Sequence, residues 1–129
     1  MSVGNVVVSG VLRSPLHRML SGSTGLVRYT GRRSGRQFIT PAQYVEHGAD
    51  VLILVGHAET KTWWRNFRSD RDLEVLVRRT WRMMTARAVV GTDEPGTIAP
   101  LLDAYLQRFP KAARLLGDPF TVVVWCHPR

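Results

Sequence analysis

A chain of 129 residues is the size of one domain, large enough to bury a single hydrophobic core. Its 44% hydrophobic and 22% charged residues are ordinary for a globular protein, and no apolar run approaches the roughly 18 residues of a membrane span. Lys and Arg number 18 against 10 Asp and Glu, giving a net charge of +8. This excess predicts an anionic partner, which composition leaves open between nucleic acid, anionic lipid and a phosphorylated cofactor.

The first 21 residues are expected to form a helical arm, because apolar residues recur there at close to helical spacing. Ser14 suits an N-cap, and Pro15 suits the first position of a second helical turn. The basic residues of the arm are Arg13, His17 and Arg18. Such a helix either packs on the rest of the domain, the interpretation we favour, or contacts an anionic membrane through residues 1–20. The N-terminus lacks the continuous apolar core of a signal peptide, so a cytoplasmic location is expected.

The loop Gly31-Arg32-Arg33-Ser34-Gly35 lies between two stretches typical of strands. Glycine adopts positive φ without steric cost, so backbone N–H groups can turn inward as an anion nest. Arginine adds a planar fork of donors that matches a phosphate or carboxylate. The pattern therefore indicates a phosphate site, and the alternative is a solvated hairpin turn with a basic tip.

Strands are predicted where β-branched or alternating apolar residues lie between turn residues. They cover residues 26–30, 36–45, 51–56, 73–77, 82–90 and 120–126. Trp63 and Trp64 fall in a predicted helix of about two turns. A helical stripe ending at Phe109 predicts a longer helix that starts at Pro95, and Pro110 would open a short one ending at Gly117. Six strands with few helices predict one mainly β (α+β) domain over residues 1–129, closed into a small antiparallel barrel.

The common machinery of nucleophilic, metal and nucleotide enzymes is missing from the sequence. No G-x-S-x-G, Walker, G-x-G-x-x-G or H-E-x-x-H motif occurs. The four histidines lack metal-ligand spacing, so no metal site is expected. Cys126 is the only cysteine, which excludes an internal disulfide, and its apolar surroundings predict a buried structural thiol. Hydride-transfer enzymes need none of these motifs, because the cofactor carries the chemistry.

Three motifs in order resemble the deazaflavin-dependent nitroreductase family. They are the basic loop 31–35, the strand Thr40-Pro41-Ala42-Gln43-Tyr44, and the segment Lys61-Thr62-Trp63-Trp64-Arg65-Asn66-Phe67-Arg68. Residues 14–18 and 105–110 extend the resemblance over nearly the whole chain. It implies a six-stranded antiparallel split β-barrel of the flavin-binding fold group, with flanking helices. The implied cofactor is coenzyme F-420, a deazaflavin with a strongly anionic phosphodiester and glutamate tail.

By the family's pattern the cofactor groove is formed by three parts of the chain. Arg32, Arg33, Ser34 and Gly35 would hold the phosphate, and the Thr40-Pro41-Ala42 backbone would lie beside the ring. His57, Lys61, Trp63 and Trp64 would form the other wall. The implied reaction is hydride transfer from reduced coenzyme F-420 to a small electrophile such as a quinone, a nitroaromatic or an activated alkene. Tyr44 or Tyr105 would supply a proton.

Each assignment has a structural alternative. Trp63 and Trp64 point different ways on a helix, so one is expected in the core, and Tyr105 lies on the apolar stripe. Two positions differ from the family's pattern: Phe38 stands where many members of the family carry a basic residue, and residues 56–59 stand where several members have a more cationic turn. Both differences favour a changed ligand. The rival is a non-catalytic protein of the same fold that binds lipid, haem or flavin mononucleotide (FMN), with FMN as the second cofactor option. No nucleic-acid motif occurs, so no such partner is expected, and the choice between monomer and homodimer stays open.

Overall fold

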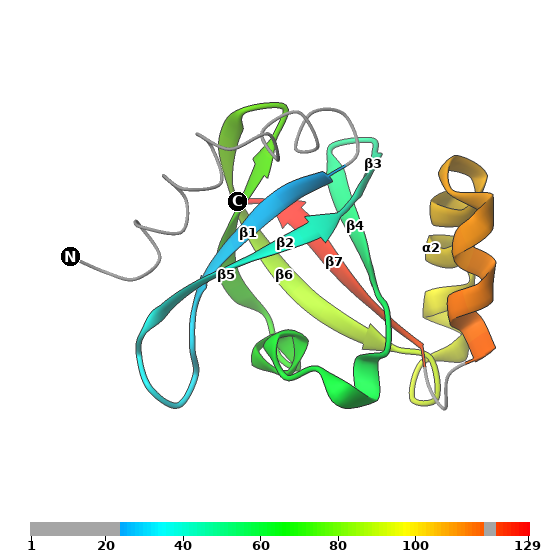
Figure 1. The fold of residues 1–129 in the computed structure, drawn as a ribbon, viewed down its shortest axis with the longest axis horizontal. Coiled ribbons are helices and arrows are strands. Elements are labelled where there is room, and N and C mark those ends of the chain that lie inside the picture. Colours follow the sequence, from blue (N-terminus) through cyan, green and yellow to red (C-terminus); the bar gives the residue numbers. More distant parts are fainter. Residues whose placement is uncertain (1–23, 118–120) are drawn as a thin grey trace.

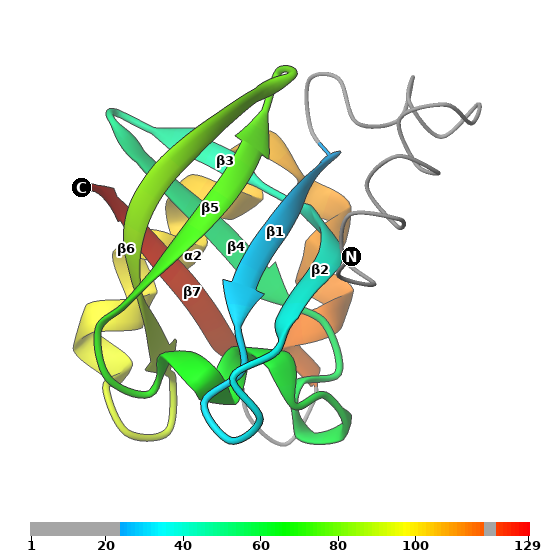
Figure 2. The same ribbon diagram turned by 90° about the vertical axis from the view of Figure 1, so that its left-hand side faces the viewer.

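The computed structural model describes residues 24–117 and 121–129. Its strands form one antiparallel sheet with the order β2-β1-β5-β6-β7-β4-β3. They are β1 (Thr24–Thr30), β2 (Gln37–Gln43), β3 (Val45–His47), β4 (Asp50–Val55), β5 (Arg71–Val77), β6 (Thr80–Val90) and β7 (Val122–Pro128). Figures 1 and 2 show that this sheet curls round on itself, with the β1–β2 loop at one end and the β5–β6 turn at the other.

The two outermost strands of the sheet, β2 and β3, are consecutive in the chain. β2 pairs with β1, while β3 pairs with β4, and Tyr44 alone separates them. The chain itself therefore bridges the two edges of the curled sheet. The predicted mainly β split-barrel class is confirmed, but the described residues form seven strands where six were expected. The predicted strand 36–45 is two strands, because a change of pairing partner leaves no mark on the side-chain alternation.

Alternation along the strands sorts apolar side chains between the inside and the outside of the barrel. In β4, for example, Val51 and Ile53 belong to the interior cluster, while Leu52 lies in a cluster outside. The interior cluster also contains Val27, Tyr29, Tyr44, Val55, Ala58, Trp64, Phe67, Leu73, Val75, Val77, Met84, Ala86, Ala88, Val90, Val122, Val124 and Cys126. Cys126 is fully buried, as predicted, and burial raises the pKa of its thiol to about 12.

Helix α2 (Pro95–Arg108) covers the outer face of β4, β6 and β7 (Figure 1). It begins at a proline, as expected, because proline lacks only an N–H that the first turn leaves unpaired. Its apolar stripe packs Ile98, Leu101 and Tyr105 on the sheet. The chain then turns at Pro110 into η4 (Pro110–Gly117), which confirms the predicted second short helix.

Two short 3-10 turns, η2 (Ala58–Thr60) and η3 (Trp63–Phe67), lie under the end of the barrel that carries the β1–β2 loop (Figure 2). The helix of about two turns expected at Trp63 and Trp64 is present as η3, a 3-10 helix of five residues. With three residues per turn, a 3-10 turn places Trp64 and Phe67 in line, and both are buried in the interior cluster. The Trp64 indole N–H donates to the Ala58 carbonyl at 2.8 Å and thereby ties the two turns together.

The predicted N-terminal arm, residues 1–21, lies outside the described residues. No helix in the described ranges is long and apolar enough to cross a lipid bilayer.

Candidate functional site: an arginine-lined groove beside the β1–β2 loop

The loop between β1 and β2 is shaped by its two glycines. The Gly31 N–H donates to the Arg36 carbonyl at 2.8 Å, and the Gly35 N–H donates to the Gly31 carbonyl at 3.0 Å. Gly35 has a φ of +71°, which favours glycine. At Gly31 a Cβ would lie only 2.7 Å from Cε2 of Phe38, so a side chain there would displace that ring.

Asn66 of η3 fastens this loop to the barrel. Its Oδ1 accepts a 2.8 Å hydrogen bond from the Arg32 backbone N–H, and its Nδ2 donates at 2.8 Å to the Trp63 carbonyl. Among the described residues, Asn66 is the one buried residue with a polar or charged side chain, and only 8% of its surface is exposed. Ser34 Oγ accepts from the Arg36 N–H at 3.2 Å. Four N–H groups of the loop are thus used inside the protein, so the loop offers side-chain donors in place of the predicted backbone nest.

A cavity of about 480 Å³ lies between the loop and η3. One side is aromatic, with the Tyr29 ring stacked on Phe38 at 5.6 Å and tilted toward Trp63 at 6.2 Å between centroids. The other side is cationic and polar. The cavity is lined by Tyr29, Gly31, Arg32, Arg33, Ser34, Phe38, Thr62, Trp63, Arg65 and Asn66.

A second cavity, of about 580 Å³, shares Arg32, Arg65 and Asn66 with the first, so the two form one groove. Its remaining lining residues are Arg68, Ser69 and Arg71. The Arg65 and Arg68 guanidinium carbons lie 4.6 and 5.2 Å from the centroid of the Trp64 ring. Among the described residues, no carboxylate lines either cavity.

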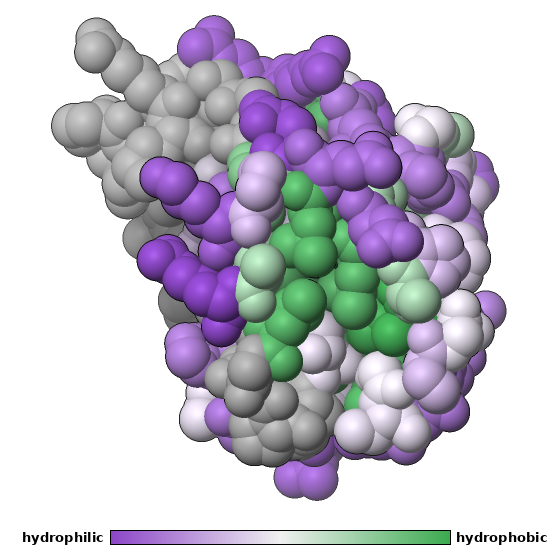
Figure 3. Space-filling view, turned by 90° about the vertical axis from the view of Figure 1, so that its right-hand side faces the viewer, coloured by the Kyte–Doolittle hydropathy of each residue, from purple (hydrophilic) through white to green (hydrophobic). Residues whose placement is uncertain are grey.

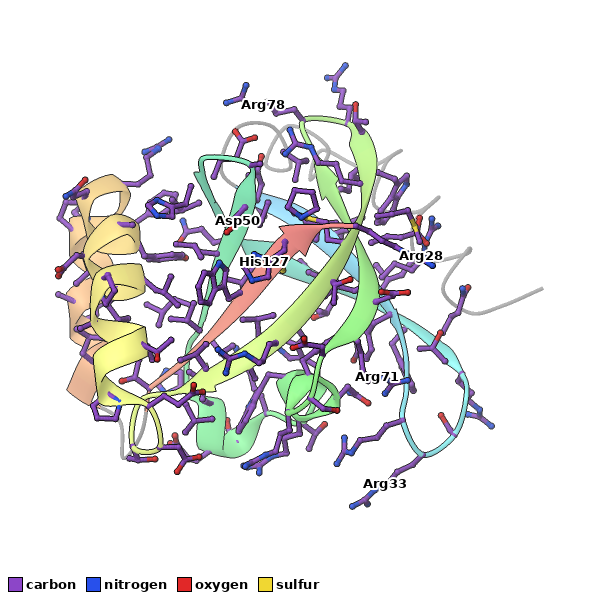
Figure 4. All side chains as sticks on the ribbon, turned by 180° about the vertical axis from the view of Figure 1, so that it is seen from behind. Arg28, Arg33, Asp50, Arg71, Arg78 and His127 are labelled. Carbon is purple, nitrogen blue, oxygen red and sulfur yellow. The ribbon has the colours of Figure 1, made fainter. Side chains whose placement is uncertain are left out.

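Most of the positive charge of this groove is not paired with any carboxylate in the part of the chain that the structure describes. In residues 24–117 and 121–129, Arg32, Arg33, Arg68 and Arg71 form no ion pair. The Arg71 Nη1 atom is buried and has no hydrogen-bond partner among those residues. A buried donor without a partner costs about 1–3 kcal/mol, and more when it is charged. Figure 4 shows Arg33 projecting from the loop tip. These residues fit an anionic group that brings its own oxygen acceptors.

Thr40, Pro41 and Ala42, predicted to lie beside a cofactor ring, sit on β2, opposite Val27, Leu26 and Gly25 of β1. β2 is an edge strand, where proline is tolerated because one side of the strand needs no partner. Seven strand residues span about 23 Å, so β2 joins the arginine groove at one end to Gln43 at the other.

His57 and Lys61 flank η2 and are exposed, and neither lines the arginine groove. His57 has a left-handed φ of 53°, and its carbonyl accepts hydrogen bonds from the Thr60 N–H at 3.0 Å and the Thr60 hydroxyl at 2.8 Å. The two tryptophans separate as expected. Trp63 is half-buried and faces the first cavity, while Trp64 is fully buried and supports it from inside.

The two tyrosines predicted as proton donors lie apart, in different hydrophobic clusters. Tyr44 points into the barrel, where its hydroxyl is buried without a hydrogen-bond partner among the described residues. Tyr105 lies on the buried face of α2, with its hydroxyl 3.3 Å from Gln43 Oε1 and 3.4 Å from the Gln43 carbonyl oxygen. Burial raises the pKa of Tyr44, and raises that of Tyr105 to about 12. Both hydroxyls therefore hold their protons more tightly than an ordinary tyrosine.

Sequence reasoning did not assign Asn66, Arg68 and Arg71 to the phosphate site. Asn66 could have been found from the sequence, because a lone amide between Trp64 and Phe67 is a signal of a buried hydrogen bond. Arg68 directly follows η3, and Arg71 reaches the groove at the start of β5, which pairs with β1, an arrangement that local sequence does not show.

An antiparallel split barrel with an arginine-lined groove is typical of a class of cofactor-binding proteins, and comparison with known proteins identifies the family. The chain belongs to the F-420H(2)-dependent quinone reductase family, whose model matches residues 12–125. The family's cofactor is coenzyme F-420, which identifies this protein as a reductase of the deazaflavin-dependent class.

A curated relative agrees with the family assignment, and solved structures agree with the fold. A Mycobacterium tuberculosis protein named as an F-420H(2)-dependent quinone reductase is 29% identical over 86 residues, which cover 64% of this chain and 71% of the relative. A solved F-420-H2 dependent reductase, FDR-A, superimposes with a TM-score of 0.66 at 18% identity, over 84% of this chain and 96% of its own. A structure described as a domain-swapped dimer gives 0.65 at 16% identity, over 93% and 99%. At these identities the two structures support the fold alone.

Proposed function

We propose that the protein reduces small quinones with electrons from reduced coenzyme F-420, and that the arginine groove holds the phosphate of the coenzyme. The observation that carries this proposal is the unpaired charge of the groove: arginines from the β1–β2 loop, η3 and the start of β5 face cavities that no carboxylate of residues 24–117 or 121–129 lines. Holding like charges close together costs free energy because the charges repel one another, and a bound anion removes that cost.

Arg32, Arg33 and Ser34 would bind the phosphate, since guanidinium forks and a hydroxyl supply charge-assisted donors. Asn66 would fix the position of Arg32 through the backbone. Trp63 and Phe38 would exclude water from one side of the tail. The Thr40-Pro41-Ala42 edge of β2 would lie along the deazaflavin ring. When bound in its reduced form, the coenzyme supplies a hydride.

Within this proposal the protein contributes orientation and exclusion of water rather than a side-chain nucleophile. Tyr44 and Tyr105 hold their protons tightly, so we assign them to positioning and take the second proton of quinone reduction from solvent. The tyrosine variants test this point: Tyr105→Phe should retain turnover, with kcat lowered by at most about a hundredfold.

The test of the proposal is a binding and turnover experiment on the purified chain. Fluorescence titration should show tighter binding of coenzyme F-420 than of FMN. Oxidation of the reduced coenzyme should require both the protein and a quinone such as menadione. Tight binding of FMN with no binding of coenzyme F-420, or binding without any turnover of an electrophile, would contradict the proposal.

A further inference from the structure

A third cavity, of about 450 Å³, lies at the far end of β2 from the arginine groove. It opens where α2 ends and η4 begins, beside Gln43. Its lining combines three apolar residues, Phe109, Pro110 and Ala112, with three cations, Arg108, Lys111 and Arg114. None of the residues assigned above to the phosphate lines it.

The apolar part of this cavity suits a flat ring. Phe109 is half-buried, and its ring lies 5.5 Å from that of Tyr105 at an interplanar angle of 48°. The Arg108 guanidinium carbon lies 4.8 Å from the centroid of the Phe109 ring, as in a cation–π contact. Figure 3 shows a hydrophobic patch bordered by hydrophilic residues on this side of the molecule.

The polar part of the cavity carries positive charge, and none of its described lining residues is a carboxylate. Arg108, Lys111 and Arg114 form no ion pair with any described residue. Gln43 adds an amide at the margin, and the Tyr105 hydroxyl holds that amide in place from below. A ligand that matches both parts has an aromatic ring and an anionic substituent.

We propose that this cavity is the substrate site, an inference that rests on the proposed function. Through Arg108, Lys111 and Arg114 the site selects aromatic electrophiles that bear a carboxylate or a sulfonate. Its place at the end of the strand assigned to the deazaflavin ring puts such a substrate next to the electron donor. For a quinone substrate the reaction balances: the reduced coenzyme gives up two electrons with one proton, and a second proton from solvent completes the hydroquinone.

The experiment compares two quinones that differ in charge, 1,4-naphthoquinone and 1,4-naphthoquinone-2-sulfonate. The measured quantity is the ratio of their kcat/KM values in the wild type and in the double variant Lys111→Gln/Arg114→Gln. An exposed ion pair contributes about two- to fivefold, so the double variant should lower the sulfonate-to-neutral ratio by roughly four- to twenty-five-fold. Arg79→Gln is the matched control, because Arg79 is exposed at the β5–β6 turn and lines none of the three cavities.

Binding of the sulfonate to the cofactor-free protein, followed by calorimetry, provides a readout that does not depend on turnover. Affinity should fall by the same factor in the double variant and stay unchanged in Arg79→Gln. An unchanged ratio and unchanged affinity in the double variant would overturn the assignment, even if menadione is reduced normally. If the double variant weakened the binding of coenzyme F-420 and left the binding of the sulfonate unchanged, the cavity would hold the coenzyme's tail. That result would also contradict the proposal. Failure of the proposed function would show differently, as absence of turnover with both quinones.

Discussion

Two groups of arginines in this protein differ in their partners. In the first group each arginine meets a carboxylate: Arg28 binds Glu74 through two hydrogen bonds of 2.7 and 3.1 Å, and Arg87 binds Glu94 at 2.7 Å. Arg78 and Arg82 share Glu46, and Arg129 pairs with Asp72. At the loop end of the barrel, Arg32, Arg33, Arg68 and Arg71 have no such partner among the described residues.

This difference separates structural charge from functional charge. A paired arginine adds to the stability of the sheet that carries it, whereas a cluster of unpaired arginines repels itself and gains from a bound anion. The net charge of +8 could not reveal this difference, because each arginine adds one positive charge to it whether or not the arginine is paired. The predictions below test the two groups against each other.

The largest effect is expected for the double variant Arg32→Ala/Arg33→Ala. Each charge-assisted hydrogen bond is worth about 1.5–3 kcal/mol, so losing both arginines should weaken coenzyme F-420 binding roughly a hundredfold or more. Because both side chains are exposed, the melting temperature of the free protein should change little. Fluorescence titration and thermal unfolding measure the two outcomes. An unchanged affinity would mean that the loop is only a basic turn.

The next effect is expected at Asn66, the link between loop and barrel. Asn66→Ala leaves the Arg32 N–H and the Trp63 carbonyl without their partner, so the free energy of unfolding should fall by about 1–3 kcal/mol. Coenzyme affinity should fall with it, because Arg32 is no longer fixed. Chemical denaturation and the same titration report both changes. Thr62→Ala, a neighbouring substitution at an exposed residue, serves as control and should alter stability by less than about 0.5 kcal/mol.

A smaller effect, on stability and not on coenzyme affinity, is expected at a paired arginine. Arg28→Ala removes the contact with Glu74 and the guanidinium that lies 4.1 Å from the Trp81 ring centroid. Its cost should be about 1 kcal/mol of stability, with coenzyme affinity unchanged. If this substitution weakened the coenzyme as strongly as the loop variants, the division into two groups would be wrong.

The smallest effect at neutral pH concerns Tyr105 and Cys126, whose pKa values burial raises to about 12. The folded state holds these two protons more tightly than the unfolded chain does. Their contribution to stability is therefore complete at a pH below the ordinary pKa, which is 9.0 for Cys126 and 10.0 for Tyr105. It is lost as the pH rises from there toward 12. Denaturation at pH 8 and pH 10.5 should show a fall that Tyr105→Phe reduces. A pH-independent stability in this range would contradict the assigned burial.

Much of the fold was predictable because it is written in local pattern. The continuous apolar run from Val51 to Val55 predicted a strand, the apolar stripe of α2 predicted a helix, and the two glycines marked the loop. The division of β2 from β3 at Tyr44 was not predictable, because it depends on which strand each segment pairs with. The same holds for the site: Arg32 and Arg33 stand out in the sequence, while Arg71 joins them only through the pairing of β5 with β1.

The most direct test of the central claim compares two ligands in two proteins. Coenzyme F-420 and a deazaflavin fragment without the phosphate are titrated into the wild type and into Arg33→Ala. If the unpaired arginines bind the phosphate, the wild type should prefer the full coenzyme by about ten- to a hundredfold, and the variant should lose most of that preference while binding the fragment as before. Equal affinity of the wild type for both ligands, or a preference that survives in Arg33→Ala, would contradict the account.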